Sequence, residues 1–248
     1  MAPGRGAGAA GAERRIAPVR ALDLVLEPGG WPEAEPHRGE IEAHFAARRA
    51  ANPALWNGAL LLLRRHALVD GVFSGAFRQT DFAAFLWWRE AMEWRDLGLV
   101  NAFALAAIEG ADGAFVLGVM GPTTAVPGQT YFPGGTPDLS DVADGGRVDL
   151  DGQAMRELAE ETGLQPRDVA RDEGFVALFD GPRIAFMRRL VFAATGAELA
   201  GRIRGFLAAE REPELEDVLV VRDERDITPR VVPFAAAYIR ARWAAGRR

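Results

Sequence analysis

Hydrophobic and polar residues along this chain follow two spacings, and each spacing predicts a different element. Short runs in which apolar residues alternate or follow one another predict strands at residues 20–26, 59–68, 72–78, 102–109, 114–120, 174–180, 184–194 and 218–221. Apolar residues three and four positions apart predict helices at residues 35–49, 81–94, 151–162, 198–210 and 233–245. Asp70-Gly71 and Asp112-Gly113 separate paired strands and indicate tight hairpins. Because strands and helices are interleaved, the predicted fold class is mixed α/β.

The same pattern divides the chain into three parts. Residues 1–19 begin with Gly- and Ala-rich sequence that lacks apolar periodicity, so we expect a disordered tail. The pattern over residues 20–98 predicts a small α+β region. We expect it to pack on the main domain, predicted at residues 99–248. In the helix predicted at 81–94, Trp87 and Trp88 are adjacent and cannot share one face. We therefore expect one of them to be packed and the other exposed.

Composition narrows the function classes. The chain has 248 residues, of which 49% are hydrophobic, as expected for one large domain or a domain with a smaller one appended. The net charge is −6, and there is no domain-wide basic surface of the kind that binds nucleic acid. All 29 basic residues are arginine, which excludes lysine Schiff bases and Walker-type phosphate loops. Cysteine is absent, which excludes thiol nucleophiles and thiolate metal sites.

The apolar runs also bear on the cellular location. None reaches the roughly 18 residues that a membrane-spanning helix needs, and the chain does not begin with a charged segment followed by an apolar signal core. We therefore expect no membrane partner and a cytoplasmic location.

One stretch, residues 156–164, carries the strongest chemical signal. Glu157, Glu160 and Glu161 lie at relative positions 0, 3 and 4, so on a helix their carboxylates project to one side. Each like-charged pair would cost roughly 0.2–0.5 kcal/mol on an exposed helix. Hard divalent cations prefer oxygen ligands of this kind. Leu158 lies on the packing face, and Gly163 follows where a left-handed C-terminal cap would end the helix. We favour a cation site over a solvated acidic face.

The stretch from Arg156 to Leu164 resembles the core of the Nudix box, Arg-Glu-(apolar)-x-Glu-Glu-x-Gly-(apolar), at every defined position. Pro133-Gly134-Gly135 resembles the turn that precedes it. Residues 101–248 thus resemble Nudix hydrolases. The resemblance implies an α/β/α sandwich with a mixed sheet and hydrolysis of the diphosphate bond in a nucleoside diphosphate linked to another group. It also implies a requirement for Mg²⁺ or Mn²⁺.

The loop before this helix departs from the family pattern. In the usual box, the second glycine lies about 14 residues before the arginine, whereas here the separation is 21 (156 − 135). The upstream glutamate of the family would fall at Val148, and the adjacent Asp149 is a candidate substitute. Other loop carboxylates within reach of a cation, which we interpret mainly as solvated, are Asp138, Asp141 and Asp144.

The resemblance implies roles for the residues of the box. Glu157 and Glu161 are expected to be the principal metal ligands, and Glu160 a ligand or an orienting partner. Arg156 is expected to fix Glu160 from outside the coordination sphere. These four residues are the catalytic candidates of the helix.

Two further groups complete the candidate site. The backbone of Gly134 and Gly135 is expected to bind substrate, because residues without side chains allow close approach to phosphate. Several members of the family recruit a general base from a late acidic loop, and this chain has glutamates at 210, 212, 214 and 216. We favour Glu214 and Glu216, with a glutamate of the helix as the competing base.

The N-terminal region suggests a substrate. Asn52-Pro-Ala-Leu-Trp-Asn-Gly58, a hairpin and then Thr80-Asp81-Phe82 resemble the segment before the Nudix domain in UDP-sugar pyrophosphatases. The lead substrate is therefore a UDP-sugar, cleaved to UMP and a sugar 1-phosphate. ADP-ribose, NADH and coenzyme A are alternative substrates, and a Nudix module that senses a nucleotide without cleaving it is an alternative function. The expected partner is a small-molecule nucleotide, and a homodimer stays open as the assembly.

Overall fold

Two β-sheets form the framework of the computed structural model over the residues it describes, 14–246. The strands are β1 (Arg15–Val19), β2 (Ala21–Leu26), β3 (Ala59–Val69), β4 (Val72–Asp81), β5 (Asn101–Glu109), β6 (Phe115–Met120), β7 (Thr130–Tyr131), β8 (Gly134–Gly135), β9 (Val169–Asp180), β10 (Arg183–Phe192) and β11 (Leu215–Val221). The larger sheet has the order β1-β9-β10-β5-β6-β11, with β7 beside β6 and β8 beside β5. The smaller sheet has the order β2-β4-β3.

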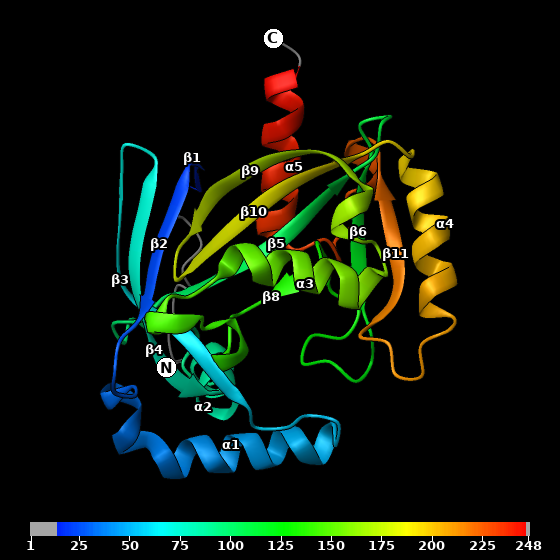
Figure 1. Ribbon diagram of the computed structural model, residues 1–248. Helices are drawn as coiled ribbons and strands as arrows, with labels where there is room; N and C mark the ends of the chain where they lie inside the picture. The colour runs from blue at the N-terminus through cyan, green and yellow to red at the C-terminus, as the bar shows by residue number, and fades with distance from the viewer. Residues whose placement is uncertain (1–13, 247–248) are drawn as a thin grey trace, which may run out of the picture.

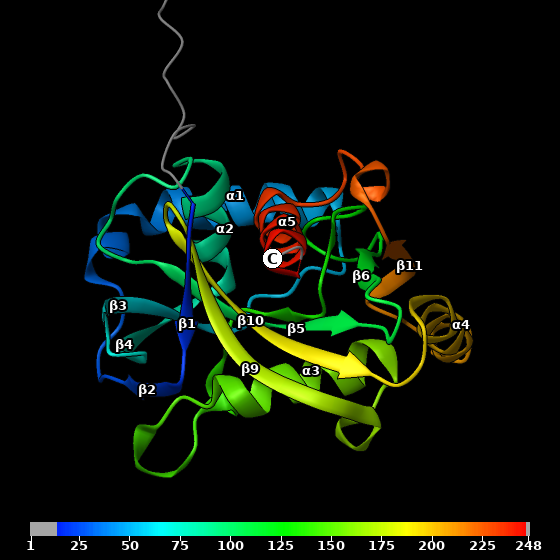
Figure 2. The same cartoon turned by 90° about the horizontal axis from the view of Figure 1, so that it is seen from above.

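The helices lie on both faces of the larger sheet. They are α1 (Arg38–Ala51), α2 (Phe82–Glu90), α3 (Leu150–Thr162), α4 (Gly196–Leu207) and α5 (Pro233–Gly246). Short 3₁₀ turns occupy Pro32–His37, Leu139–Asp141, Asp144–Gly146, Pro166–Asp168 and Glu224–Asp226. Helices α3 and α4 cover one face and α5 the other, while α1 and α2 lie beside the smaller sheet (Figures 1 and 2). The predicted mixed α/β sandwich is confirmed.

Strand β5 determines where the helices sit. It pairs in parallel with β10 and antiparallel with β6, and eight of its nine residues are buried. Alternate side chains point to opposite faces of a sheet. Phe103 and Leu105 therefore pack toward α5, whereas Ala106 and Ile108 pack toward α3 and α4. This alternation keeps α3 against a rigid, fully buried strand.

The N-terminal region packs tightly around α2. Trp87 and Trp88 are both buried, so the prediction that one of them is exposed is wrong. The ring of Trp31 meets Trp88 edge-on at 5.6 Å between ring centroids, and His37 lies 4.9 Å from Trp87. Segments on either side of the helix in sequence thus cover its second face. Trp88 also donates a hydrogen bond from Nε1 to the carbonyl of Arg95 (2.7 Å).

The chain enters the larger sheet before it builds the smaller one. Strand β1 pairs antiparallel with β9, from Arg15 opposite Phe179 to Val19 opposite Phe175. The expectation of a disordered tail is therefore wrong for residues 15–19, because backbone pairing with β9 and burial of Val19 hold this segment. Residues 1–13 of that prediction lie outside the described residues. The boundary at residue 98 stays a prediction.

The two sheets share one cluster of buried side chains. Leu24, Leu61 and Phe73 from the smaller sheet pack in the same cluster as Ala104 and Phe186 from the larger one. Between residues 14 and 246, no helix combines the length and apolar character that a membrane crossing requires.

Candidate functional site

Helix α3 presents the glutamates, and its two ends fix its position. Asp149 is the N-cap, and its Oδ1 accepts a hydrogen bond from the amide of Gly152 (3.1 Å). The helix predicted at residues 151–162 therefore begins one residue earlier, because Leu150 is buried and already lies in the first turn. Gly163 closes the helix in the left-handed conformation, with φ of 71°, as predicted.

The start of α3 also shows which residues lie where the family pattern has its upstream glutamate. Val148, at the family's glutamate position, is buried in the core between the two sheets. The carboxylate of Asp149 is used to cap the helix. Asp149 therefore serves the start of α3 rather than the far end of the helix, where the three glutamates lie.

The three glutamates of α3 differ sharply in exposure. The side chain of Glu160 is 59% exposed and that of Glu157 is 18% exposed. Glu161 is only 6% exposed and lies on the side of the helix that buries Leu158. The acidic face thus turns from solvent into the protein interior within one helical turn.

Glu161 is held by the glycine turn. Its Oε1 accepts a hydrogen bond from the amide of Gly134 (2.8 Å), while its buried Oε2 has no hydrogen-bond partner within residues 14–246. Gly134 has φ of 134°, and a Cβ there would lie 2.2 Å from the carbonyl oxygen of Ala104. Only glycine fits this approach to β5. The structure therefore gives the Gly134 amide a task other than the substrate contact expected from the sequence.

Gly135 is also engaged within the protein. It pairs with Ala104 of β5, and its carbonyl accepts a hydrogen bond from Nε2 of the buried Gln153 on α3 (3.0 Å). The glycine turn thus joins the central strand to the glutamate helix.

Arg156 binds the glutamates to the lengthened loop. Its guanidinium contacts Oδ1 of Asp141 at 2.7 Å, Oε1 of Glu157 at 3.0 Å and Oε2 of Glu160 at 3.0 Å. The Asp141 side chain is only 3% exposed. The expectation that Asp141 is a solvated loop residue is therefore wrong, because Arg156 neutralises its charge inside the protein.

Sequence reasoning missed this pairing. A weak signal was present, because Asp138 and Asp141 have the spacing of a capping box, which they form around the 3₁₀ turn Leu139–Asp141. That box fixes Asp141 locally. Its contact with Arg156 depends on how the loop folds back onto α3.

The carboxylates raise one another's pKa. Burial raises the pKa of Glu157 to about 7; Arg156 opposes the rise, and the charges of Glu160 and Glu214 add to it. Burial likewise raises the pKa of Glu161 well above its ordinary value, reinforced by Glu214 and Glu157. Glu214 is exposed over part of its side chain, yet the protein around its carboxylate raises its pKa too. The cluster holds more negative charge than its surroundings compensate.

A cavity of about 160 Å³ opens in front of these carboxylates. It is lined by Glu157, Glu160, Glu161, Phe206, Leu207, Glu210, Glu212, Pro213 and Glu214. The fold therefore brings the late acidic segment, which follows α4, against the last turns of α3. Glu214 faces the same cavity as the three helix glutamates, and Glu216 does not.

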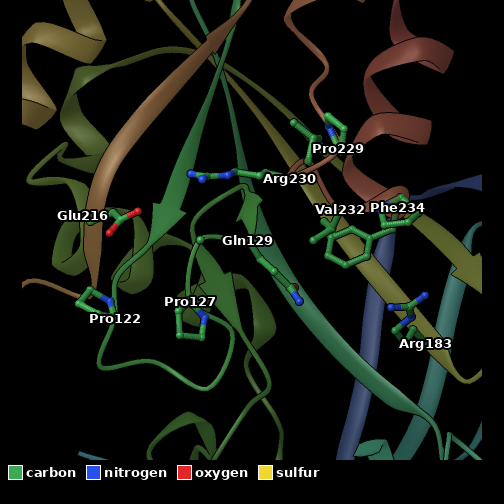
Figure 3. A pocket seen from close by; sticks show the side chains of 12 residues that line it. Pro122, Pro127, Gln129, Arg183, Glu216, Pro229, Arg230, Val232 and Phe234 are labelled. Atoms are coloured by element: carbon green, nitrogen blue, oxygen red, sulfur yellow. The ribbon is translucent and has the colours of Figure 1, made fainter. Parts of the chain in front are cut away.

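Glu216 instead lines a second, larger cavity of about 660 Å³, shown in Figure 3. Proline and valine side chains, Phe234, Gln129, Arg183 and Arg230 form its other walls. The ring of Phe234 lies 5.8 Å from the Arg183 guanidinium and 6.2 Å from the ring of Tyr131. Planar apolar surface and hydrogen-bonding groups thus meet in one hollow.

Tyr131 packs against Phe234 of the larger cavity and was not predicted as a site residue. Burial raises the pKa of its hydroxyl, and the charges of Glu161 and Glu214 act in the same direction. Its only signal in the sequence was its place just before the Pro133-Gly134-Gly135 turn.

The residues present fit a divalent cation in their donor chemistry. Carboxylate oxygens are suitable ligands, and the buried Oε2 of Glu161 lacks a partner. As the side chains lie, however, no three acidic or histidine residues within 14–246 converge on a common point. Arg156 pairs with both Glu157 and Glu160. Binding a cation among the three helix glutamates would therefore require their side chains to rearrange.

Without metal, the stability of the protein should depend on pH. The folded state keeps a proton on Glu157 up to about pH 7, whereas the ordinary pKa is 4.5. The free energy of unfolding should therefore fall as pH rises from 4.5 through 7, by about 3 kcal/mol for this residue at 1.36 kcal/mol per pKa unit. Denaturant unfolding in EDTA at pH 5 and pH 8 measures the difference.

Magnesium should reverse this loss. Added Mg²⁺ is expected to stabilise the protein more at pH 8 than at pH 5, because ligands bind a cation in their deprotonated form. The Glu157→Gln variant is the control and should lose much of the pH dependence. Equal stabilisation by Mg²⁺ at both pH values would contradict a carboxylate site.

Comparison with known proteins gives fold-level likenesses alone. No family model matches the chain, and no curated protein matches it. Among solved structures, the chain is similar to the Nudix hydrolase RenU from M. smegmatis, with 18% sequence identity and a TM-score of 0.38. The matched part covers 59% of this chain and 84% of that one. A MutT protein from Methanosarcina mazei Go1 shares 16% identity and a TM-score of 0.39, covering 60% and 96%. A Nudix hydrolase from Nitrosomonas europaea shares 15% identity and a TM-score of 0.37, covering 60% and 91%.

These structures are what the chain is similar to. With identities below 20% and TM-scores below 0.4, they assign no role to any residue of the site. Any role for these residues rests on the motif and on the contacts of α3, the glycine turn and the acidic segment before β11.

Proposed function

We propose that this protein is an enzyme that hydrolyses the diphosphate bond of a nucleoside diphosphate linked to a second group, with Mg²⁺ or Mn²⁺. The observation that carries the proposal is Glu161, a buried carboxylate with one oxygen bound to Gly134 and the other without a partner in the described chain. Glu157, Glu160 and Glu214 face the same cavity. A buried carboxylate that shares a cavity with further carboxylates calls for a cation.

The residues divide the chemistry between them. A bound divalent cation would supply charge neutralisation at the phosphates and lower the pKa of water. Glu157 and Glu161 are the proposed ligands, with Glu160 as a further ligand or an orienting partner. Arg156 forms ion pairs with Glu157 and Glu160 on the helix and with Asp141 on the loop, and so connects the two glutamates to the loop.

Glu214 is the proposed general base. It shares the small cavity with the helix glutamates, and its raised pKa lies closer to neutrality than that of an ordinary carboxylate. Glu216 lines the larger cavity, so we assign it to binding the remainder of the substrate.

This assignment predicts different kinetics for two similar variants. Glu214→Gln should lower kcat by about 10²–10⁴-fold, the usual contribution of a general base. Glu216→Gln should mainly raise KM. Steady-state kinetics at saturating Mg²⁺ separate the two effects, and an unchanged kcat in Glu214→Gln would return the role of base to a helix glutamate.

A UDP-sugar is the lead substrate, with UMP and a sugar 1-phosphate as products. The support is the resemblance of the N-terminal segment between residues 52 and 82 to UDP-sugar pyrophosphatases. The test is a panel of UDP-sugars, ADP-ribose, NADH and coenzyme A incubated with Mg²⁺ and scored for the two products of diphosphate cleavage. Turnover of another member would replace the lead substrate. Thermal stabilisation by a nucleotide without turnover would favour a sensor.

A further inference from the structure

Side chains of the N-terminal region donate hydrogen bonds to backbone carbonyls of the loop between β6 and β7. Nδ2 of Asn52 donates hydrogen bonds to the carbonyl oxygens of Thr123 and Thr124, both at 3.1 Å. Arg48, one helical turn earlier, donates from its guanidinium to the carbonyl of Ala125 (3.1 Å). Three successive carbonyls of one loop are thus bound by side chains from the end of α1 and the residue after it.

The other end of this loop contacts the proposed base. The amide of Gly121 donates a hydrogen bond to the backbone carbonyl of Glu214 (2.8 Å). A Cβ at Gly121 would lie 2.8 Å from that carbonyl oxygen, so the close approach requires glycine. Within the loop, Oγ1 of Thr124 donates to the carbonyl of Gly121 (2.8 Å). An unbroken series of hydrogen bonds therefore joins Asn52 to the backbone of Glu214.

We propose that Asn52 is a positioning residue, which acts through residues 121–124 to hold Glu214 at the small cavity. The inference rests on the proposed function, because it assigns Asn52 to the same reaction. It gives the N-terminal region a part in the chemistry that its place in the sequence does not suggest. The same loop also supplies Pro122, Pro127 and Gln129 to the larger cavity, so one anchor serves both hollows.

The two ends of the Asn52 amide have separate tasks. Its Oδ1 accepts a hydrogen bond from the amide of Ala54 (3.2 Å), which stabilises the turn after α1. Its Nδ2 serves the loop. An aspartate at this position keeps the first contact and replaces the donor of the second with a carboxylate oxygen that faces carbonyl oxygens. The loop contact can therefore be removed while the acceptor of the turn is kept.

The test compares Asn52→Asp and Asn52→Ala in the full chain with Mg²⁺ and the best substrate of the panel. Both variants should lower kcat by about tenfold, since misplacement of a reacting group by about 1 Å can cost about 100-fold. KM should change less than kcat. The control is Asn57→Ala, in the same region. Oδ1 of Asn57 accepts a hydrogen bond from the amide of Ala83 (2.8 Å) at the start of α2. Its loss should lower Tm without lowering kcat.

Hydrogen exchange provides a readout that needs no turnover. The amide of Gly121 should exchange faster in Asn52→Asp than in the wild type and in Asn57→Ala. Wild-type kcat and wild-type Gly121 exchange in Asn52→Asp would overturn the inference, and so would an equal loss of kcat in Asn57→Ala. If the wild type cleaves no nucleotide, the proposed function fails, while the exchange of Gly121 still decides whether Asn52 controls the Glu214 backbone.

Discussion

Glu161→Gln is expected to remove nearly all magnesium-dependent turnover, with kcat/KM lower by about 10³-fold. A cation contributes several kcal/mol to stabilising charge in the transition state, and about 1.4 kcal/mol corresponds to a factor of ten. Glu161 is the most buried of the six carboxylates that line the cavity, and a backbone hydrogen bond fixes it. Glutamine keeps the oxygen that binds the Gly134 amide and loses the charge. The measurement is kcat/KM as a function of Mg²⁺ concentration.

The same variant should fold normally. In metal-free buffer at pH 8, its free energy of unfolding should equal or exceed that of the wild type, because a buried carboxylate with a raised pKa opposes folding above its ordinary pKa. At pH 4 the two proteins should differ little, since the carboxyl is then protonated in both states. The matched comparison is Glu160→Gln, which changes the most exposed of the three glutamates of α3. This variant should lose less activity. Full retained activity in Glu161→Gln would rule out the metal assignment.

Periodicity along the chain predicted most of the framework, and its failures share one cause. The hairpins at Asp70-Gly71 and at 112–113 and the central strands carry their signals locally, in turn residues and apolar runs. Strand β1 has no such signal, because its partner β9 lies more than 150 residues away in sequence. The burial of both Trp87 and Trp88 likewise depends on segments outside α2. Contacts between distant residues decide these features, and spacing does not encode them.

The candidate site divides in the same way. The spacing of Glu157, Glu160 and Glu161 placed three carboxylates together on one helix, and their proximity is visible in the structure. Spacing did not reveal that Glu161 faces inward, because that depends on the Gly134 turn packing against β5. Nor did it separate Glu214 from Glu216, which lie two residues apart and line different cavities. Geometry therefore refines which carboxylate does what.

The second large effect is expected where the lengthened loop meets α3. A double-mutant cycle on Arg156 and Asp141 measures it. Arg156→Met is expected to lower the free energy of unfolding by about 2–3 kcal/mol, because it leaves Asp141 buried without its partner. The loss should lie below the ~3–5 kcal/mol of a fully buried pair, since the Arg156 side chain is 38% exposed. Removing a positive charge from between Glu157 and Glu160 should also lower kcat by about tenfold.

Asp141→Asn in the Arg156→Met background should restore more than half of the lost stability, because the buried charge is then gone while an oxygen remains for the amide of Asp138. It should not restore kcat, since the guanidinium that holds Glu157 and Glu160 is still missing. Denaturant unfolding of the four proteins gives the coupling energy, expected at about 1–2 kcal/mol. Additive losses would mean that the loop and the helix are stabilised independently. Recovery of kcat in the double variant would mean that Arg156 serves the fold alone and that the loop, rather than the arginine, sets the geometry of the glutamates.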